Sequence, residues 1–490
     1  MSYLDTVDAY TICIGILIIV LILIICGNGW MNRSLPPGPW ALPLIGNVPQ
    51  LLGSKNFHLK CLELRQIYGD VLHLKVGGVD VIVILDYKLI QDTLKNEGEK
   101  FAFRPNWLHV LNKVYRKKGI TWNHGANFER LKNFTKCPLS QATGVENRIL
   151  DELQSLSNIM DLSRDKPVPL QKVLSKAVTG IICGITFGAR YDEKEPDFLY
   201  LTGLLEKFHK QSIFQLSENF MPWVRFLPFQ SALKDFLDVE NKLRTFMKKR
   251  IQDHKDTFNE GDIRDFIDHY LNPNKKDRIE SCVSDDDISR TIIDLLYIGP
   301  DVLTSAILWA ILYLVRSPGV QKKIQNELKE VVGTDSVAKI SHRAKLPFMR
   351  ATIKEILRIA SPVPMGYPHT VTENVKLAEY TIPKNTIVFF HLQAAHNDHT
   401  YWKRPQEFRP DRFLDDGEEI KHDCFFPFSV GPRACIGEDL AQNVMFLFLS
   451  NLLQKFTFKS PEGASVPSTE SVYTNSLRPV EFDVVAIPNE

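Results

Sequence analysis

One short segment near the C-terminus constrains this chain more than any other feature. It reads Phe428-Ser-Val-Gly431-Pro-Arg433-Ala-Cys435-Ile-Gly437. A lone cysteine thiolate is one of the few protein ligands of haem iron. The flanking glycines allow a backbone to approach a flat cofactor closely, and an arginine can neutralise a haem propionate. Cysteine is also a common buried core residue, but the combination of five spaced positions favours a haem loop.

This segment resembles the haem-binding loop of the cytochromes P-450, and every defining position of that loop is present. Three further matches follow the family's order, namely Pro36–Pro39 (proline hinge), Glu355–Arg358 (E-x-x-R) and Pro405–Phe413 (P-x-x-F-x-P-x-R-F). The resemblance runs from about residue 30 to the C-terminus. It implies a mainly α protein with a small β region, and a haem b whose iron is bound by the Cys435 thiolate.

Composition narrows the functional class further. The chain has 490 residues, of which 44% are hydrophobic, and its length alone would suggest about three domains. No Gly/Ser-rich linker divides it, and the family resemblance implies a single haem-thiolate domain over residues 33–490. The net charge of +1 gives no bulk attraction to nucleic acid. Eight scattered cysteines without a C-x-x-C pair argue against a zinc site or a disulfide framework, and they fit a reducing compartment.

The N-terminus predicts a membrane anchor. Residues 9–32 carry no charge, which suffices for a transmembrane signal-anchor helix over residues 11–32 after a short lumenal segment, residues 1–10. A cleaved signal peptide is the alternative, but the basic start and small-residue cleavage site that it needs are missing. Basic residues follow the anchor, so the positive-inside rule places the catalytic domain in the cytosol. The sequons at Asn32 and Asn133 should then carry no glycan.

Hydrophobic periodicity predicts the main elements. Helices are expected over residues 145–160, 232–256, 286–316, 345–360 and 434–453, the last beginning within the haem loop. A β-hairpin is expected over residues 71–86, a strand near residue 390, and strands and turns over residues 459–490.

The family resemblance also assigns supporting residues. Glu355 and Arg358 would form a buried pair beneath the haem loop, and Arg412 would supply the third partner that a buried guanidinium requires. Removing one member would leave an uncompensated buried charge. We interpret these three residues as structural rather than catalytic.

Arg433, Arg104, Lys132 and His369 fall where related proteins place partners of the haem propionates, and Phe428, Gly431 and Gly437 complete the cofactor-binding set. The chain departs from the family's W-x-x-x-R pattern, which reads Phe128-x-x-x-Lys132 here. Lysine is a point charge where arginine offers a planar fork. For His369, an ordinary buried or surface histidine is the equally weighted alternative.

The helix expected to activate oxygen departs from the family pattern A-G-x-D/E-T. Gly299 and Asp301 are kept, but Val302 stands where the family has threonine, so the hydroxyl that would assist proton delivery is missing. Asp301 is either a proton-relay carboxylate or a charge turned away from the haem and satisfied by water or an arginine. Pro300 predicts a kink near residues 296–300, since it lacks the N–H of a helical residue.

The resemblance implies a monooxygenase of the endoplasmic-reticulum membrane that oxidises a lipophilic molecule, such as a steroid, fatty acid or xenobiotic. NADPH would supply electrons through a flavoprotein reductase, with cytochrome b5 as a further partner. Apolar Ile298, Val302, Leu303 and Val363 would line the substrate pocket. Two alternatives remain, an isomerase or dehydratase of oxygenated lipids that needs no external electrons, and a haem sensor without turnover. NADPH consumption would distinguish the monooxygenase from both of these alternatives.

Overall fold

The computed structural model describes residues 10–18, 34–52, 56–141, 144–163, 166–188, 194–209, 216–226, 231–272, 283–334 and 336–489. Most of the expected anchor, residues 11–32, and of the lumenal segment, residues 1–10, lies outside these ranges. Residues 10–18 are helical. The anchor and the domain boundary at residue 33 therefore stay predictions.

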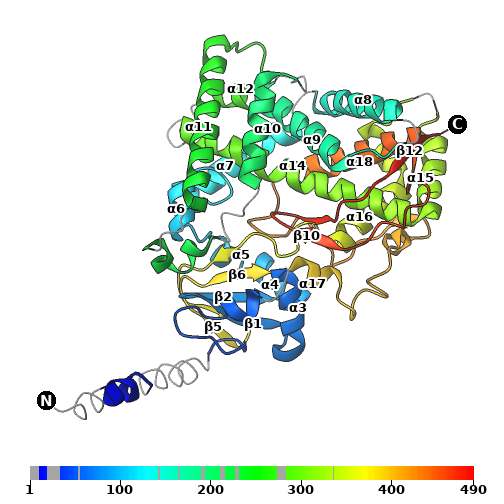
Figure 1. Ribbon diagram of the computed structural model, residues 1–490. Coiled ribbons are helices and arrows are strands. Elements are labelled where there is room, and N and C mark those ends of the chain that lie inside the picture. The colour runs from blue at the N-terminus through cyan, green and yellow to red at the C-terminus, as the bar shows by residue number, and fades with distance from the viewer. Residues whose placement is uncertain are drawn as a thin grey trace.

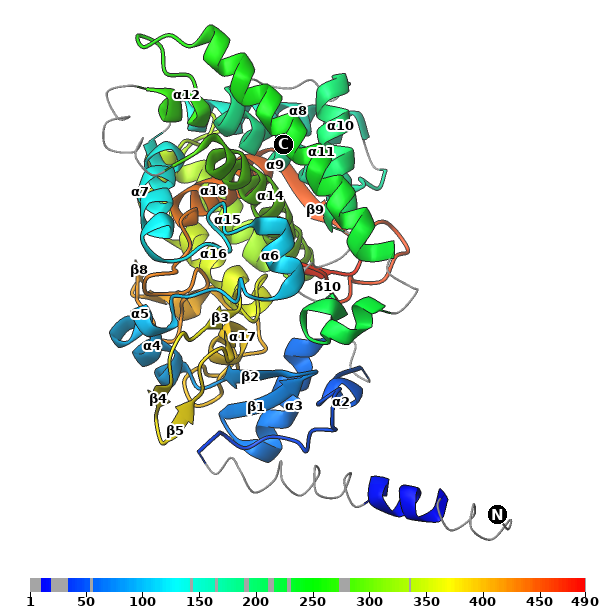
Figure 2. The ribbon, with the colours of Figure 1, turned by 90° about the vertical axis from the view of Figure 1, so that its left-hand side faces the viewer.

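The fold is mainly helical, with its largest sheet at one side (Figures 1 and 2). Its centre is the long helix α14, Asp285–Arg316, which packs against α9 (Leu170–Phe187), α11 (Ser231–Thr257), α16 (Pro347–Ala360) and α18 (Glu438–Lys455). A Ser284 capping box starts α14, because the Ser284 side chain and the Asp287 side chain each bond the other's backbone. Most of the α14 side chains are buried, as expected for a helix surrounded by others.

The remaining helices surround this centre. They are α2 Val48–Leu52, α3 Phe57–Tyr68, α4 Tyr87–Asn96, α5 Gly98–Phe101, α6 His109–Tyr115, α7 Gly125–Gln141, α8 Val145–Ser163, α10 Pro196–His209, α12 Phe266–Leu271, α15 Pro318–Val331 and α17 Leu392–His396, with the 3₁₀ turns η2 Ser217–Asn219, η3 Pro222–Phe226, η4 Ile340–Lys345 and η5 Pro410–Phe413.

The largest sheet has the order β1-β2-β6-β3, formed by Val71–Val76, Val79–Ile84, Ile387–Phe390 and His369–Thr370. β1 and β2 form the predicted hairpin around Gly77-Gly78, and β6 joins β2 in parallel. Four two-stranded sheets complete the β structure: β4 Val375–Leu377 with β5 Tyr380–Ile382, β7 Leu414–Asp415 with β8 Glu418–Glu419, β9 Phe456–Lys459 with β12 Val485–Pro488, and β10 Ser471–Tyr473 with β11 Leu477–Pro479.

One element prediction needs adjustment, and the kink predicted near Pro300 stays a prediction. The helix after the haem loop begins at Glu438 and not at residue 434, because residues 431–437 form the turns that present the cysteine. Helix α14 continues through Pro300 without interruption. In the turn before this proline, the Tyr297 carbonyl lies 2.6 Å from a ring nitrogen of His209. A side chain from α10 therefore bonds a backbone carbonyl at the point where a kink was expected.

Two described helices, α9 and α14, are long and apolar enough to cross a membrane by length and composition. Both are mostly buried, with 72% and 83% of their most apolar windows inside the protein. Burial to this extent identifies them as core helices of the domain.

Candidate active site

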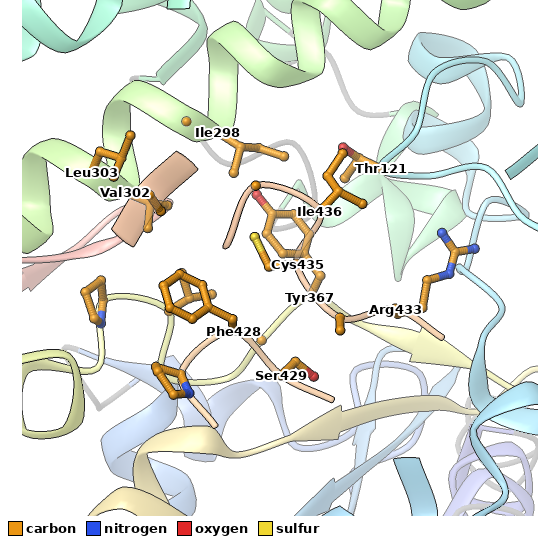
Figure 3. A pocket seen from close by; sticks show the side chains of 18 of the residues that line it. Thr121, Ile298, Val302, Leu303, Tyr367, Phe428, Ser429, Arg433, Cys435 and Ile436 are labelled. Atoms are coloured by element: carbon orange, nitrogen blue, oxygen red, sulfur yellow. The ribbon is translucent and has the colours of Figure 1, made fainter. Parts of the chain in front are cut away.

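The side chain of Cys435 opens into a cavity of about 300 Å³ between α14 and the loop that precedes α18. Figure 3 shows Cys435 with the α14 side chains Ile298, Val302 and Leu303 across the cavity. The sequence-predicted residues Gly299, Arg104, His369, Phe428, Arg433 and Gly437 also line it. The structure thus brings the predicted thiolate, most of the predicted cofactor contacts and an apolar helix face to one cavity.

The loop holds Cys435 through backbone contacts. Its N–H donates to the Phe428 carbonyl at 2.9 Å, and the Gly437 N–H bonds the sulfur. Burial raises the pKa of the Cys435 thiol to about 11, and the Gly437 N–H opposes that rise. Gly431 has a positive φ of 81°, and a Cβ there would lie 2.0 Å from the Leu94 carbonyl oxygen. Only glycine fits at that position.

Two arginines line one end of the cavity, and no carboxylate of the described residues contacts either of them. Arg433 donates to the backbone carbonyls of Ala102 (2.6 Å) and Asn123, and its guanidinium lies 3.4 Å from the centre of the Phe128 ring. Arg104 donates to the carbonyls of Tyr367 and Pro368, at 3.1 and 2.8 Å. The Arg104 Nε is buried and has no partner among the described residues.

Burial lowers the pKa of both guanidinium groups, of Arg104 to about 10 and of Arg433 to about 8, and Arg104 further lowers that of Arg433. Such shifts mark a positive charge that the protein itself does not balance. A group with two carboxylates would balance it. The pair of arginines, one with an orphaned buried donor, beside a thiol that faces an apolar cavity therefore fits a haem with its two propionates.

The other two predicted propionate partners differ in their fit. The Lys132 ammonium donates to the Pro432 carbonyl at 2.9 Å and lies 3.6 Å from Glu129, so it holds the haem loop itself. The His369 Nδ1 donates to the Phe101 carbonyl at 2.6 Å, and burial lowers the pKa of the ring well below its usual value. The neutral ring then presents an acceptor nitrogen on its other side. A direct bond to a carboxylate would require a second proton on His369.

The predicted three-residue lock is present. Glu355 and Arg358 are fully buried, and the Arg358 guanidinium donates to the Glu355 carboxylate at 2.7 and 2.9 Å. Arg412 reaches the same carboxylate at 3.0 Å. The remaining Arg358 donors bond the carbonyls of His396 and Pro405, both at 2.8 Å. The lock therefore ties α16 to the segment from Pro405 to Phe413.

The three α14 residues that were predicted to act in oxygen activation do not all face the cavity. Gly299 and Val302 line the cavity, whereas Asp301 does not. One carboxylate oxygen of Asp301 accepts from Arg478 on β11. Its other oxygen, Oδ2, is buried and has no partner among the described residues. An arginine partner was one of the two sequence-based interpretations of Asp301, and a role in proton transfer stays a prediction.

The sequence analysis did not identify Asp294, a second carboxylate of α14, which lines the cavity whereas Asp301 does not. It accepts from the Ile120 and Thr121 backbone N–H groups, both at 3.0 Å, and from buried Arg290 at 2.9 Å. These bonds fix the loop between α6 and α7 against α14. The available signal was an acidic residue within an otherwise apolar helical pattern, which requires a buried partner.

Comparisons with known proteins agree with this geometry. The family model described as cytochrome P-450 matches residues 36–484. Cytochrome P-450 2U1 of Rattus norvegicus is 32% identical, over 94% of this chain and 94% of its own length. Cytochrome P-450 2J2 of Homo sapiens is 30% identical over 93% and 92%, and cytochrome P-450 1A1 of Rattus norvegicus is 33% identical over 90% and 88%.

Proposed function

The chain belongs to the cytochrome P-450 family and is an oxidoreductase of the P-450 monooxygenase type, and from that premise we propose that it oxidises a lipophilic small molecule with electrons from NADPH. The observation that carries the proposal is the shared cavity, in which the Cys435 thiol, two unbalanced arginines and an apolar face of α14 meet. The family implies haem with a cysteine thiolate ligand.

The residues present would hold that haem as follows. Cys435 would supply the thiolate ligand, Arg433 and Arg104 would neutralise the propionates, and Lys132 would support the loop through its bond to the Pro432 carbonyl. Thiolate-ligated haem supplies oxygen activation and O–O bond cleavage. His369 orients the neighbouring backbone through Phe101 and adds a propionate contact when its second nitrogen is protonated.

The substrate would lie against the apolar part of the cavity, formed by Ile298, Val302, Leu303 and Val363. These side chains offer no hydrogen bonds, so they select for apolar surface and exclude water. A carbon atom of the substrate is thereby held over the same side of the cavity toward which Cys435 points (Figure 3).

Proton delivery would rest on the segment from Gly299 to Val302. Val302 contributes shape but no hydroxyl, so we assign the proton to Asp301 Oδ2, the carboxylate oxygen that Arg478 leaves free. A water would connect that atom to the cavity, since a bridging water can replace one hydroxyl. Arg478 acts as a positioning residue for the carboxylate.

The proposed setting is the endoplasmic-reticulum membrane, with a single N-terminal span and the domain in the cytosol. A flavoprotein reductase, with cytochrome b5 as an accessory donor, would deliver the electrons. The described cysteines are free, which fits a domain on the reducing, cytosolic side of the membrane.

One observation favours a second candidate. Val302 lines the cavity at the position where the family's threonine assists oxygen activation. A rearrangement of an oxygenated lipid, such as a peroxide, would need neither that hydroxyl nor external electrons.

The deciding experiment supplies the purified holoenzyme with a reductase, NADPH and a library of lipophilic compounds. Substrate-dependent NADPH consumption with one oxygen atom gained by the product supports the monooxygenase. Conversion of a lipid hydroperoxide without NADPH, and no NADPH consumption with any compound, would overturn it in favour of the isomerase.

A further inference from the structure

A second cavity, of about 640 Å³, continues from the one that Cys435 faces. The two cavities share Thr121, Ile298, Val363, Met365, Gly366 and Tyr367 as lining residues. Tyr367, which lines both cavities, is labelled in Figure 3. One elongated molecule can therefore extend from the haem side into the second cavity. The second cavity would then hold the far end of that molecule.

Most of the second cavity is apolar. Leu51, Phe57, Val81, Phe220, Met221 and Phe389 supply much of its wall. None of its described lining residues is Asp, Glu, Lys, Arg or His. A ligand with an ionised group would leave that group without a partner there, at a high cost in desolvation. The cavity therefore suits an uncharged molecule with a long apolar body.

One end of this cavity is polar and carries hydrogen-bond donors. The Asn475 Oδ1 accepts from the Tyr297 hydroxyl at 2.8 Å, whereas its Nδ2 is buried and has no partner in the described part of the chain. Tyr473 lines the same end, and burial raises its pKa to about 12, so the phenol stays a neutral donor. An amide N–H without a partner among the described residues and a neutral phenol thus come from the same turn between β10 and β11, which suits a hydrogen-bond acceptor.

The groups behind this end explain why the acceptor should be neutral. Arg478 is already paired with Asp301, so its charge is balanced within the protein. A carboxylate of the ligand would therefore find no free cation among the described residues that line this cavity. A carbonyl oxygen would meet only donors.

We propose that the second cavity is the subsite for an elongated, uncharged lipid with a carbonyl or ester oxygen at the end remote from the oxidised carbon. This proposal rests on the proposed function, because it names the substrate class of the same site. Asn475 Nδ2 and the Tyr473 hydroxyl donate to that oxygen. The lipid is thereby fixed at one end, and the other end is presented in the cavity that Cys435 faces.

The test uses the full-length holoenzyme and three probes of matched chain length, namely methyl dodecanoate, dodecanoate and dodecane. Dissociation constants are measured from the ligand-induced shift of the haem absorption band. The ester should bind about three- to tenfold more tightly than the alkane, as one or two neutral hydrogen bonds provide. Ionised dodecanoate should bind about tenfold more weakly than the ester, or not at all.

Two variants and a matched control assign the preference to the polar end. Asn475→Leu and Tyr473→Phe should each lower the ratio of ester to alkane affinity toward one, and they should move product oxidation to positions nearer the ester. Tyr115→Phe is the control, because Tyr115 lines the same cavity but its hydroxyl already bonds Trp122. It should leave the ratio unchanged.

The proposal is overturned if dodecanoate binds as tightly as the ester. It is also overturned if Asn475→Leu leaves the ester preference intact, which would mean that the polar end holds water only. Failure of the proposed function looks different, since the wild-type protein would then lack the carbon-monoxide difference band of thiolate-bound haem or would consume no NADPH. If the protein shows both properties but no preference for the ester, only the subsite proposal is refuted.

Discussion

At the scale of single residues, the site depends on a few atoms whose partners are set by the backbone. Gly431 admits the close approach of Leu94. One oxygen of Asp301 accepts from Arg478, and the other is buried without a partner among the described residues. A Cβ atom added at Gly431, or a nitrogen in place of one Asp301 oxygen, would disrupt the corresponding arrangement. Conservative substitutions are therefore the most informative ones here.

The relay assigned to Asp301 predicts a kinetic loss without a structural one. Asp301→Asn should slow substrate oxidation by about 10²–10⁴-fold, the range of general acid–base assistance, while haem content and ligand-induced spectral shifts stay normal. Val302→Thr should raise the fraction of NADPH electrons recovered in product. Arg478→Gln is the control for positioning, since it releases the carboxylate without removing it, and it should have a smaller effect. Wild-type turnover in Asp301→Asn and unchanged coupling in Val302→Thr would refute the relay.

The close approach at Gly431 predicts loss of the cofactor. In Gly431→Ala, the new Cβ would lie 2.0 Å from the Leu94 carbonyl oxygen at a φ of 81°, so the haem loop must shift. Haem content per purified protein should fall strongly, as measured by the pyridine haemochrome assay. Gly319→Ala, at the start of α15 with no atom within 4 Å of the new Cβ, is the matched control and should retain full haem. Equal haem content in both variants would contradict this account of the loop.

At the scale of elements, the lock of Glu355, Arg358 and Arg412 joins α16 to the segment before the haem loop. The Glu355 carboxylate accepts from both arginines and from the Arg409 backbone N–H at 2.8 Å. Because the carboxylate is fully buried, no water can replace it. The lock is thus expected to govern the stability of the domain rather than its chemistry.

Glu355→Gln leaves two arginine charges without their anion and should lower the free energy of unfolding by about 3–5 kcal/mol. Urea unfolding followed by haem absorbance and by circular dichroism measures this loss. The control is Glu407→Gln, which removes one partner of the exposed pair with Arg404, a pair worth about 0–1 kcal/mol. Equal midpoints for the two variants would show that the buried lock does not stabilise the domain.

The elements that sequence reasoning located best are those with a strong local signal. The Gly77-Gly78 turn between β-branched runs predicts the hairpin, and the long apolar pattern predicts α14 almost to the residue. The start of α18 was predicted four residues too early. The turns before this helix depend on the close approach of Gly431 to Leu94, which is far away in the sequence, and on the bond from the Cys435 N–H to the Phe428 carbonyl, so local periodicity does not reveal them. The roles of Asp294 and Arg478 were missed for a related reason, because their partners lie on other elements.

At the scale of the whole molecule, the chain combines a domain built around α14 with an N-terminal segment of membrane-spanning composition. The proposed orientation places the domain in the cytosol, where no glycosyltransferase acts on it. Asn133 lies exposed on α7, and its sequon partner Thr135 is fully buried. Protein expressed in animal cells should therefore show no mobility change on endoglycosidase treatment. A shift that Asn32→Gln or Asn133→Gln removes would reverse the topology.

The central claim is that Cys435 binds haem iron as a thiolate, and the carbon-monoxide difference spectrum of the reduced protein tests it most directly. Wild-type protein should show the band characteristic of thiolate-ligated ferrous haem. Cys435→Ala and Cys435→His should lose it, whereas Cys424→Ala, which replaces a buried cysteine outside the cavity, should keep it. Retention of the band in Cys435→Ala would contradict the account.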